Sequence, residues 1–133
     1  MSANILIVDD NPINLKLASD VLESEGFAVT RAADAEQALQ MLQLAVPDLI
    51  LMDIALPGMD GLTLTRKLKQ DERLNRVPVI ALTAFAMKGD DLKALDAGCS
   101  GYITKPIDTR SIGGQVESYL RSARADNGGA RRT

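Results

Sequence analysis

Five short apolar runs, separated by segments with helical periodicity, constrain the fold of this chain more than any other feature. These runs lie near residues 4–8, 27–31, 48–52, 78–82 and 100–104. Each run has the length of a buried strand, and the alternation of strands with helices predicts a parallel sheet with helices on both faces. With 133 residues, 46% of them hydrophobic, the chain fits one α/β domain around a single core.

Proline and glycine mark where the intervening helices begin and end. Pro12 suits the first turn of a helix that Gly26 ends, and Gly98 should close the fourth helix. The second, third and fourth helices are expected over residues 35–44, 62–69 and 84–97.

The fifth helix departs from this regularity. It should run from about residue 109 to residue 123, but Gly113 and Gly114 fall inside it. Because interior glycines weaken a helix, we predict a late or soft start. Two explanations stay open, a kinked or frayed first turn and the close approach of another backbone.

The composition excludes several kinds of function. The chain has no histidine, which rules out histidine general bases, Ser-His triads and the commonest zinc ligands. The net charge is -3, and no electrostatic footprint for nucleic acid is present. No apolar stretch approaches the ~20 residues of a membrane span, and no secretory signal is evident. Cys99 is the single cysteine, so we expect a buried structural thiol in a cytoplasmic protein.

Polar residues stand at the ends of four of the five expected strands. They are Asp9 and Asp10, Asp53, Thr83, and Lys105 followed by Pro106. The carboxyl ends of parallel strands lie along one edge of the sheet, where ligands bind, so these side chains should converge. Three adjacent carboxylates repel one another unless a cation neutralises them. A hard divalent ion with oxygen ligands, Mg²⁺ above all, satisfies this charge.

Such a site could transfer a phosphoryl group. With Mg²⁺ bound, a carboxylate oxygen of Asp53 can attack phosphorus while Lys105 offsets charge and the Thr83 hydroxyl donates to a phosphoryl oxygen. Pro106 permits a cis bond that aims the lysine inward. Each residue also has an ordinary explanation, as a helix cap, a polar strand end or a turn. Only their joint placement favours the phosphoryl site.

Four segments resemble the receiver domains of two-component response regulators, the CheY-like family. They are residues 8–11 (VDDN), 51–61 (LMDIALPGMDG), 82–84 (LTA) and 102–106 (YITKP). The resemblance covers residues 4 to about 123 and implies a doubly wound, flavodoxin-like (βα)5 domain with strand order 2-1-3-4-5. Residues 84–90, with Gly98 and Cys99, are similar to the single-domain DivK type and to receivers of hybrid kinases.

The resemblance assigns roles to the acidic residues. It implies that Asp53 accepts a phosphoryl group from a phosphohistidine of a sensor histidine kinase or histidine phosphotransferase. Asp10 and Asp53 would bind Mg²⁺ directly, Asp9 through a water molecule, and Ala55 through its backbone carbonyl oxygen. Since the chain has no histidine, the donor imidazole must lie on the partner.

The resemblance also implies a switch. Phosphorylation in this family draws the residue matching Thr83 toward the phosphoryl group and turns the aromatic residue matching Tyr102 inward. This alters the face made by the fourth helix, the fifth strand and the fifth helix, and Ala84, Phe85 and Pro106 would support the change. Plain packing in the core is the alternative role of Tyr102.

Two positions that vary in the family flank the path of the water that removes the phosphoryl group. Here they are Ala55, which cannot orient a water through its side chain, and Phe85, which could shield the phosphoryl group. We therefore expect slow self-dephosphorylation. A phosphorylated lifetime that Phe85→Ala does not shorten would contradict this expectation.

Three other functions fit the sequence less well. A phosphatase of the haloacid dehalogenase type also uses a nucleophilic aspartate and Mg²⁺, but it requires a second acid where this chain has Ala55. A degenerate receiver that only binds partners conflicts with the intact site residues. Flavin or dinucleotide binding would require a glycine-rich loop after a strand, and the sequence has none.

The ends of the chain favour a stand-alone regulator over a receiver excised from a hybrid kinase or a multidomain regulator. We expect a receiver domain over residues 1–124 and a disordered polar tail over residues 125–133. Such a protein is a phosphoacceptor that acts only on itself, not an enzyme with other substrates. Its signal would pass to a downstream protein that prefers one phosphorylation state, and neither nucleic acid nor membrane is expected as a partner.

Overall fold

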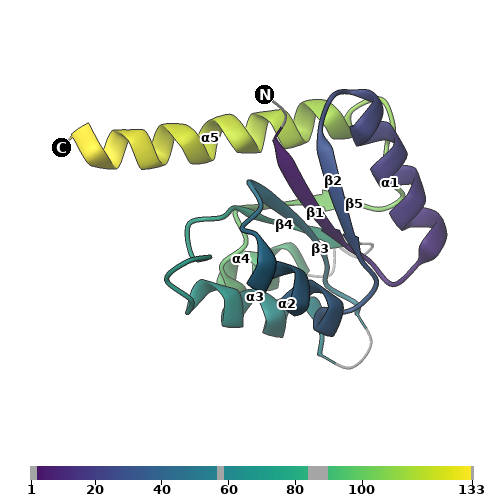
Figure 1. Ribbon diagram of the computed structural model, residues 1–133, viewed down its shortest axis with the longest axis horizontal. Helices are drawn as coiled ribbons and strands as arrows, with labels where there is room; N and C mark the ends of the chain where they lie inside the picture. Colours follow the sequence, from purple (N-terminus) through teal and green to yellow (C-terminus); the bar gives the residue numbers. More distant parts are fainter. Residues whose placement is uncertain (1–2, 57–58, 84–89, 133) are drawn as a thin grey trace.

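A parallel sheet forms the centre of the molecule (Figure 1). The computed structural model describes residues 3–56, 59–83 and 90–132. Within these residues five strands lie in the order β2-β1-β3-β4-β5, which confirms the expected topology. The strands are β1 (Asn4–Val8), β2 (Ala28–Ala32), β3 (Leu49–Asp53), β4 (Val79–Thr83) and β5 (Gly101–Thr104). Asp53 and Thr83 are thus the last residues of their strands.

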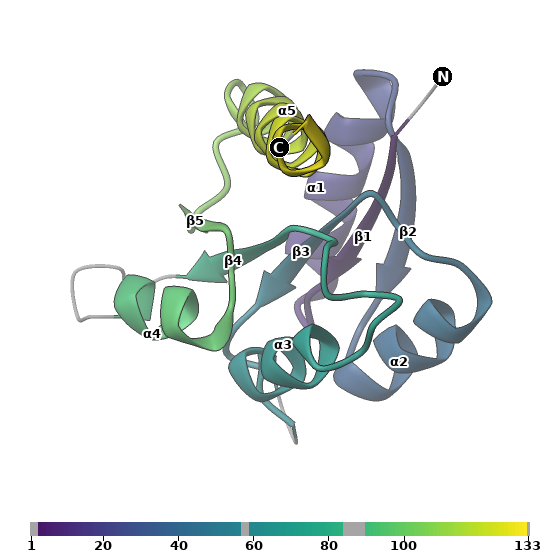
Figure 2. The same cartoon turned by 90° about the vertical axis from the view of Figure 1, so that its left-hand side faces the viewer.

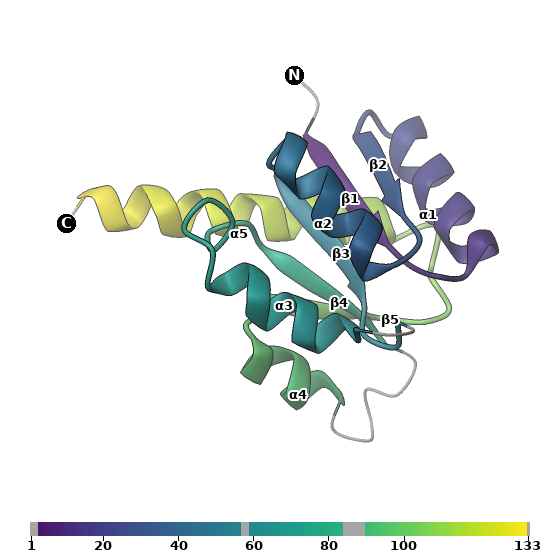
Figure 3. The ribbon, with the colours of Figure 1, turned by 60° about the horizontal axis from the view of Figure 1, so that its bottom comes forward.

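Helices cover both faces of the sheet, as the alternation of segments predicted. In the described residues they are α1 (Pro12–Ser24), α2 (Ala35–Leu44), α3 (Gly61–Lys69), α4 (Asp90–Ala97) and α5 (Ile112–Arg132). Figure 2 shows α1 and α5 on one face, and Figure 3 shows α2, α3 and α4 side by side on the other. Residues 84–89 of the expected fourth helix lie outside the described residues. No helix of the described ranges is both long enough and apolar enough to cross a membrane.

The central strands divide the core into two halves. Ile5 and Ile7 of β1 pack in the half made with α1 and α5, whereas Leu6 and Val8 pack in the half made with α2, α3 and α4. This division follows from strand geometry, in which successive side chains point to opposite faces. Because helices cover both faces, β3 and β4 are buried along their whole length.

The predicted helix ends of α1 and α4 are confirmed. The Asn11 side chain caps α1 by accepting the backbone N–H groups of Ile13 at 2.9 Å and Asn14 at 3.1 Å. Gly26 and Gly98 follow the carboxyl ends of α1 and α4 with φ angles of 99° and 110°. Glycine occupies this left-handed region without the steric cost of a Cβ atom.

Helix α5 begins late, as its two glycines predicted. It starts at Ile112 instead of residue 109. The close neighbour of Gly113 is the carboxylate of Glu25, and nothing lies within 4 Å of a Cβ atom placed on Gly114. The alternative explanation, approach of another backbone, is therefore wrong for Gly114, and the nearest atoms to Gly113 belong to a side chain.

The carboxyl end of α5 differs from the expected disordered tail. The helix continues to Arg132 and extends beyond the sheet (Figure 1). An established helix adds residues at little cost, because each new residue gains one backbone hydrogen bond. The sequence stretch from residue 126 to residue 129, Asp-Asn-Gly-Gly, has low helix propensity. The domain boundary near residue 124 stays a prediction.

Candidate functional site

Three aspartates meet at the carboxyl edge of the sheet, as their positions in the sequence predicted. Val8 of β1 pairs with Met52 of β3. The residues that follow them, Asp9 and Asp53, therefore lie beside each other. Asp9, Asp10 and Asp53 each place one carboxylate oxygen within 4.8 Å of the others. Asp9 and Asp53 are buried and Asp10 is exposed, so the cluster is open to solvent on the side of Asp10.

Lys105 reaches this cluster from the end of β5. Its Nζ atom lies 3.0 Å from Oδ2 of Asp53 and 3.4 Å from Oδ2 of Asp9. The Lys105–Pro106 peptide bond is cis, which the sequence had permitted. The Lys105 backbone N–H donates to the Thr83 carbonyl oxygen at 2.8 Å, so the ends of β4 and β5 stay joined beside the cluster.

Backbone N–H groups orient the two buried carboxylates. The N–H of Asn11 donates to Oδ1 of Asp9, and the N–H of Ala55 donates to Oδ1 of Asp53, both at 2.9 Å. In each aspartate the other oxygen, Oδ2, is the one near Lys105. Oδ2 of Asp9 is fully buried and has no hydrogen-bond partner among the described residues.

The charges in this cluster do not balance. Burial raises the pKa of Asp9, and the nearby Asp53 charge adds to this, although the Asn11 N–H and the Lys105 ammonium oppose it. Burial lowers the pKa of Lys105, but the hydrogen bond and charge of Asp53, with the charge of Asp9, outweigh burial and leave that pKa raised. One ammonium therefore faces three carboxylates. An all-oxygen donor set with excess negative charge, which includes a buried oxygen with no hydrogen-bond partner among the described residues, fits a hard divalent cation.

The remaining predicted site residues take different positions. Thr83 is buried at the end of β4, next to Lys105 through the backbone bond described above. Ala55 is exposed and brings no second acid near Asp53. Tyr102 is 38% exposed, so plain core packing is not its role in this structure. Pro106 is exposed, and Ala84 and Phe85 lie outside the described residues.

Sequence reasoning missed one residue of the site, Gly61. This first residue of α3 lies directly against the backbone of Asp53 and Ile54. A glycine immediately after the capping residue Asp60 was the available signal, but the contact joins segments that the sequence alone does not place together.

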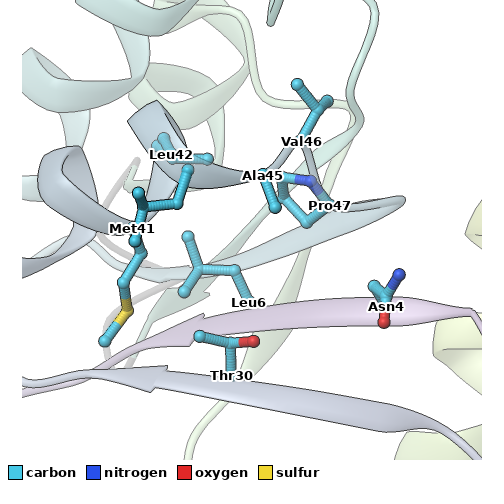
Figure 4. Close-up of a pocket in the computed structure, with 9 residues that line it drawn as sticks. Asn4, Leu6, Thr30, Met41, Leu42, Ala45, Val46 and Pro47 are labelled. Carbon is cyan, nitrogen blue, oxygen red and sulfur yellow. The ribbon is translucent and has the colours of Figure 1, made fainter.

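An apolar hollow of about 290 Å³ lies away from this cluster, toward the amino-terminal ends of the strands. Figure 4 shows Leu6 of β1 and Met41 and Leu42 of α2 around it. None of the nine described residues that line it carries a titratable side chain. Its lining therefore offers no titratable acid or base, and the candidate site remains the carboxyl edge.

The chain is similar to known signalling proteins over nearly its whole length. Residues 5–117 match the family model of the response regulator receiver domain. The chain is 45% identical, over 123 residues, to the polar-differentiation response regulator DivK of Brucella ovis and of Brucella abortus. Each alignment covers 92% of this chain and 100% of the relative.

Solved structures agree with this match. A putative response regulator from Chloroflexus aurantiacus superposes with a TM-score of 0.87 at 31% identity, over 91% of this chain and 99% of that one. The receiver domain of a sensor histidine kinase from Pseudomonas aeruginosa superposes with a TM-score of 0.79 at 38% identity, over 92% of this chain and 97% of that one. The second structure was solved with a magnesium ion coordinated in its active site cleft.

Fold, site and similarity lead to one conclusion. The strand order places an aspartate cluster and a lysine at one sheet edge, and the family model spans both the fold and the cluster. This chain belongs to the receiver domains of two-component response regulators.

Proposed function

We propose that this chain is a single-domain response regulator in which Asp53 accepts a phosphoryl group from a phosphohistidine of a histidine kinase or histidine phosphotransferase. The position of the Asp53 carboxylate carries this proposal. One oxygen accepts the Ala55 N–H at 2.9 Å and the other lies 3.0 Å from Lys105 Nζ, with Asp9 and Asp10 beside them. The carboxylate is thus held in a fixed orientation next to a cation, as a nucleophile requires.

The proposed reaction exchanges one bond for another. An Asp53 carboxylate oxygen attacks the phosphorus of the partner's phosphohistidine, and a P–O bond forms as the P–N bond breaks. The electron pair of the P–N bond stays on the imidazole nitrogen, which then takes up a proton. Lys105 offsets negative charge on the transferred group, which preorganised cations do well in partly buried sites.

We propose that Asp10, Asp53 and the Ala55 carbonyl oxygen hold Mg²⁺ directly and that Asp9 holds it through a water molecule. The three carboxylates of the cluster support this, as does Oδ2 of Asp9, which has no hydrogen-bond partner among the described residues. The metal-bound structure of the similar Pseudomonas aeruginosa receiver also supports it. When bound, Mg²⁺ would neutralise charge that otherwise keeps a phosphate dianion away from three aspartates.

The signal would leave the molecule through the face formed by α4, β5 and α5. Thr83 and Tyr102 are the proposed switch residues, one buried and one exposed in this structure. Leu92 and Leu95 of α4 are 67% and 48% exposed and Tyr102 of β5 is 38% exposed, so both elements present apolar side chains to solvent. A downstream protein that binds this surface better in one phosphorylation state would shift the balance between the two states.

The stand-alone, cytoplasmic form of the protein is part of the proposal. The match covers the whole sequence of the DivK relatives and 92% of this chain, which supports a stand-alone regulator. A receiver excised from a larger kinase or regulator stays the alternative.

Phosphoryl transfer from a panel of the host's autophosphorylated histidine kinases tests the function. Radiolabel should move to the wild-type chain in Mg²⁺ and not to Asp53→Ala, and a chelator should stop the transfer. Undiminished labelling of Asp53→Ala would remove Asp53 from its proposed role.

A further inference from the structure

Gly61 packs against the peptide that follows the proposed acceptor. A Cβ atom on Gly61 would overlap the carbonyl oxygen of Asp53 and would lie 2.8 Å from Cα of Ile54 and 2.9 Å from the carbonyl carbon of Asp53. These atoms belong to the backbone of β3 and the turn after it, so they cannot turn aside as a flexible side chain can.

Five other glycines of the described residues differ from Gly61. Gly98, Gly101 and Gly113 have side chains as their close neighbours, and the space around Gly26 and Gly114 is open. Gly61 alone among them has backbone as its close neighbour. Its lack of a side chain therefore sets how closely α3 approaches the end of β3.

The peptide beneath Gly61 leads directly into the site. It joins Asp53 to Ile54, and the next N–H, that of Ala55, fixes Oδ1 of Asp53 at 2.9 Å. A shift of this peptide would move the Asp53 carboxylate relative to Lys105 Nζ, now 3.0 Å away. It would also move Ala55, whose carbonyl oxygen is a proposed metal ligand.

The first turn of α3 is itself held in place. The Asp60 side chain caps it by accepting the Thr63 N–H at 2.8 Å. The buried Thr65 hydroxyl donates to the Gly61 carbonyl oxygen at 2.8 Å, and Cys99 Sγ lies 4.0 Å from that hydroxyl. These hydrogen bonds fix the first turn of α3 and therefore the position of Gly61 against the Asp53–Ile54 peptide.

We propose that Gly61 is a positioning residue for the acceptor site: by admitting α3 onto the Asp53–Ile54 peptide, it holds the Asp53 carboxylate and Ala55 in the arrangement that binds the divalent cation. The roles of Asp53 and Ala55 rest on the proposed function. The contact of Gly61 with the backbone does not.

Gly61→Ala tests this, with Gly114→Ala as the matched control because it adds the same methyl group to a helix where nothing lies within 4 Å. MgCl₂ is titrated into each ¹⁵N-labelled protein while the Ala55 amide resonance is followed. Gly61→Ala should shift that resonance before any metal is added and should weaken Mg²⁺ binding about 10-fold or more, as supporting residues of metal sites do. Gly114→Ala should change neither quantity. Wild-type affinity with an unshifted Ala55 resonance in folded Gly61→Ala would overturn the proposal.

Two further variants separate positioning from general stability. Val116→Ala opens a cavity in the opposite half of the core and should lower the melting temperature without changing Mg²⁺ affinity. If Gly61→Ala does not fold, Thr65→Val removes the hydroxyl that supports Gly61, and Thr65→Ser restores it. Weaker Mg²⁺ binding in Thr65→Val with recovery in Thr65→Ser supports the proposal, and equal binding in both opposes it.

The two proposals can fail separately. Acetyl phosphate, a small acyl phosphate donor, is added to the same proteins in saturating Mg²⁺. Failure of the wild type to become phosphorylated on Asp53 counts against the proposed function. The metal-free Ala55 resonance of Gly61→Ala still decides whether Gly61 positions the site.

Discussion

Replacing Lys105 by methionine tests the charge balance of the site without Mg²⁺. Methionine keeps most of the side-chain volume but removes the ammonium that lies 3.0 Å from Asp53 and 3.4 Å from Asp9. At an effective dielectric constant of about 20, each contact is worth roughly 5 kcal/mol before desolvation is subtracted. Removing one partner of a buried ion pair typically costs about 3 to 5 kcal/mol. Because the Lys105 side chain is 18% exposed, we expect a loss near the lower end, about 3 kcal/mol.

The assay is urea unfolding followed by circular dichroism at pH 8 in a chelator. With a urea dependence of about 2 kcal/mol/M, the loss corresponds to a midpoint lower by roughly 1.5 M. Added Mg²⁺ should restore part of the difference, because a cation that binds only the folded state stabilises it.

The loss should depend on pH in a defined direction. Burial already holds the pKa of Asp9 above its ordinary value, and removing the ammonium would raise that pKa further. A carboxyl with a raised folded-state pKa disfavours folding only when it is ionised. The penalty should therefore be full at pH 8 and should shrink as the pH falls through the folded pKa of Asp9.

Lys16→Met is the matched control for this substitution. Lys16 lies closer to its partner, 2.7 Å from Asp20, but the two side chains are 72% and 51% exposed. Solvent screens such a pair, so its removal should leave the unfolding midpoint unchanged. Equal midpoints for wild type and Lys105→Met at pH 8 without Mg²⁺ would refute the reasoning from burial.

Three further predictions concern the scaffold. Asn11→Ala should lower the free energy of unfolding in urea by about 1 kcal/mol, because α1 loses its cap. Mg²⁺ affinity should stay unchanged, because Asp9 accepts the backbone N–H of residue 11; a large loss of affinity would contradict this. Gly26→Ala should lower the free energy of unfolding by about 1 kcal/mol, since the φ angle of Gly26 is 99°. Gly114→Ala should raise it by up to ~1 kcal/mol, because alanine favours the helix and its methyl group meets no other atom. Opposite signs in urea unfolding would disprove this reasoning from backbone conformation. Cys99 should react with iodoacetamide far more slowly in the native protein than in urea, because burial and a raised pKa keep the thiol protonated; rapid native labelling at pH 7.5 would show that the thiol is accessible.

Strands β1, β3 and β4 were predictable because they are buried along almost their whole length and therefore read as continuous apolar runs, whereas β2 and β5 are only partly buried. Three strands, β2, β3 and β4, begin and end one residue later than the apolar runs near residues 27–31, 48–52 and 78–82, and the shift of β2 has a local cause. The Phe27 N–H donates to the Leu22 carbonyl oxygen at 3.0 Å and so belongs to the end of α1. The hydrogen bond from the Ala28 N–H to the Ala3 carbonyl oxygen is the first that joins this segment to the start of β1. In the sequence, Phe27 looks like the first apolar residue of the strand, and nothing shows that its N–H bonds to the preceding helix.

The site was predictable for a topological reason. Asp9, Asp53 and Lys105 continue the strand alternation of Ile7, Leu51 and Ile103, which all pack on the α1 and α5 side of the sheet. Parallel strands bring such positions together whatever their separation along the chain. Thr83 alternates with Val79 and Ala81, which pack on the other side of the sheet. The sequence therefore also predicted that Thr83 lies in different surroundings from Asp9, Asp53 and Lys105.

The glycines mark where sequence reasoning ends. Gly61, Gly113 and Gly114 all fall in helical segments and look alike in the sequence, yet one meets backbone, one meets the Glu25 carboxylate and one meets open space. Each difference depends on which distant segment packs against the helix. Helix propensity, which is a local quantity, cannot distinguish the three.

The aspartate cluster is the place where this chain departs from the rules that shape the rest of it. In β1, β3 and β4 the apolar side chains are covered, and the first turns of α1, α2 and α3 are capped by side chains, so local and tertiary preferences agree there. At the carboxyl edge, the two buried aspartates share Lys105, the exposed Asp10 adds a third carboxylate, and a buried carboxylate oxygen has no hydrogen-bond partner among the described residues. Burying unbalanced charge costs stability, and it is retained where a missing group completes it. The proposed cation would supply the missing positive charge, so the same imbalance that weakens the fold favours cation binding, and the bound cation would then allow the anionic phosphoryl group to approach.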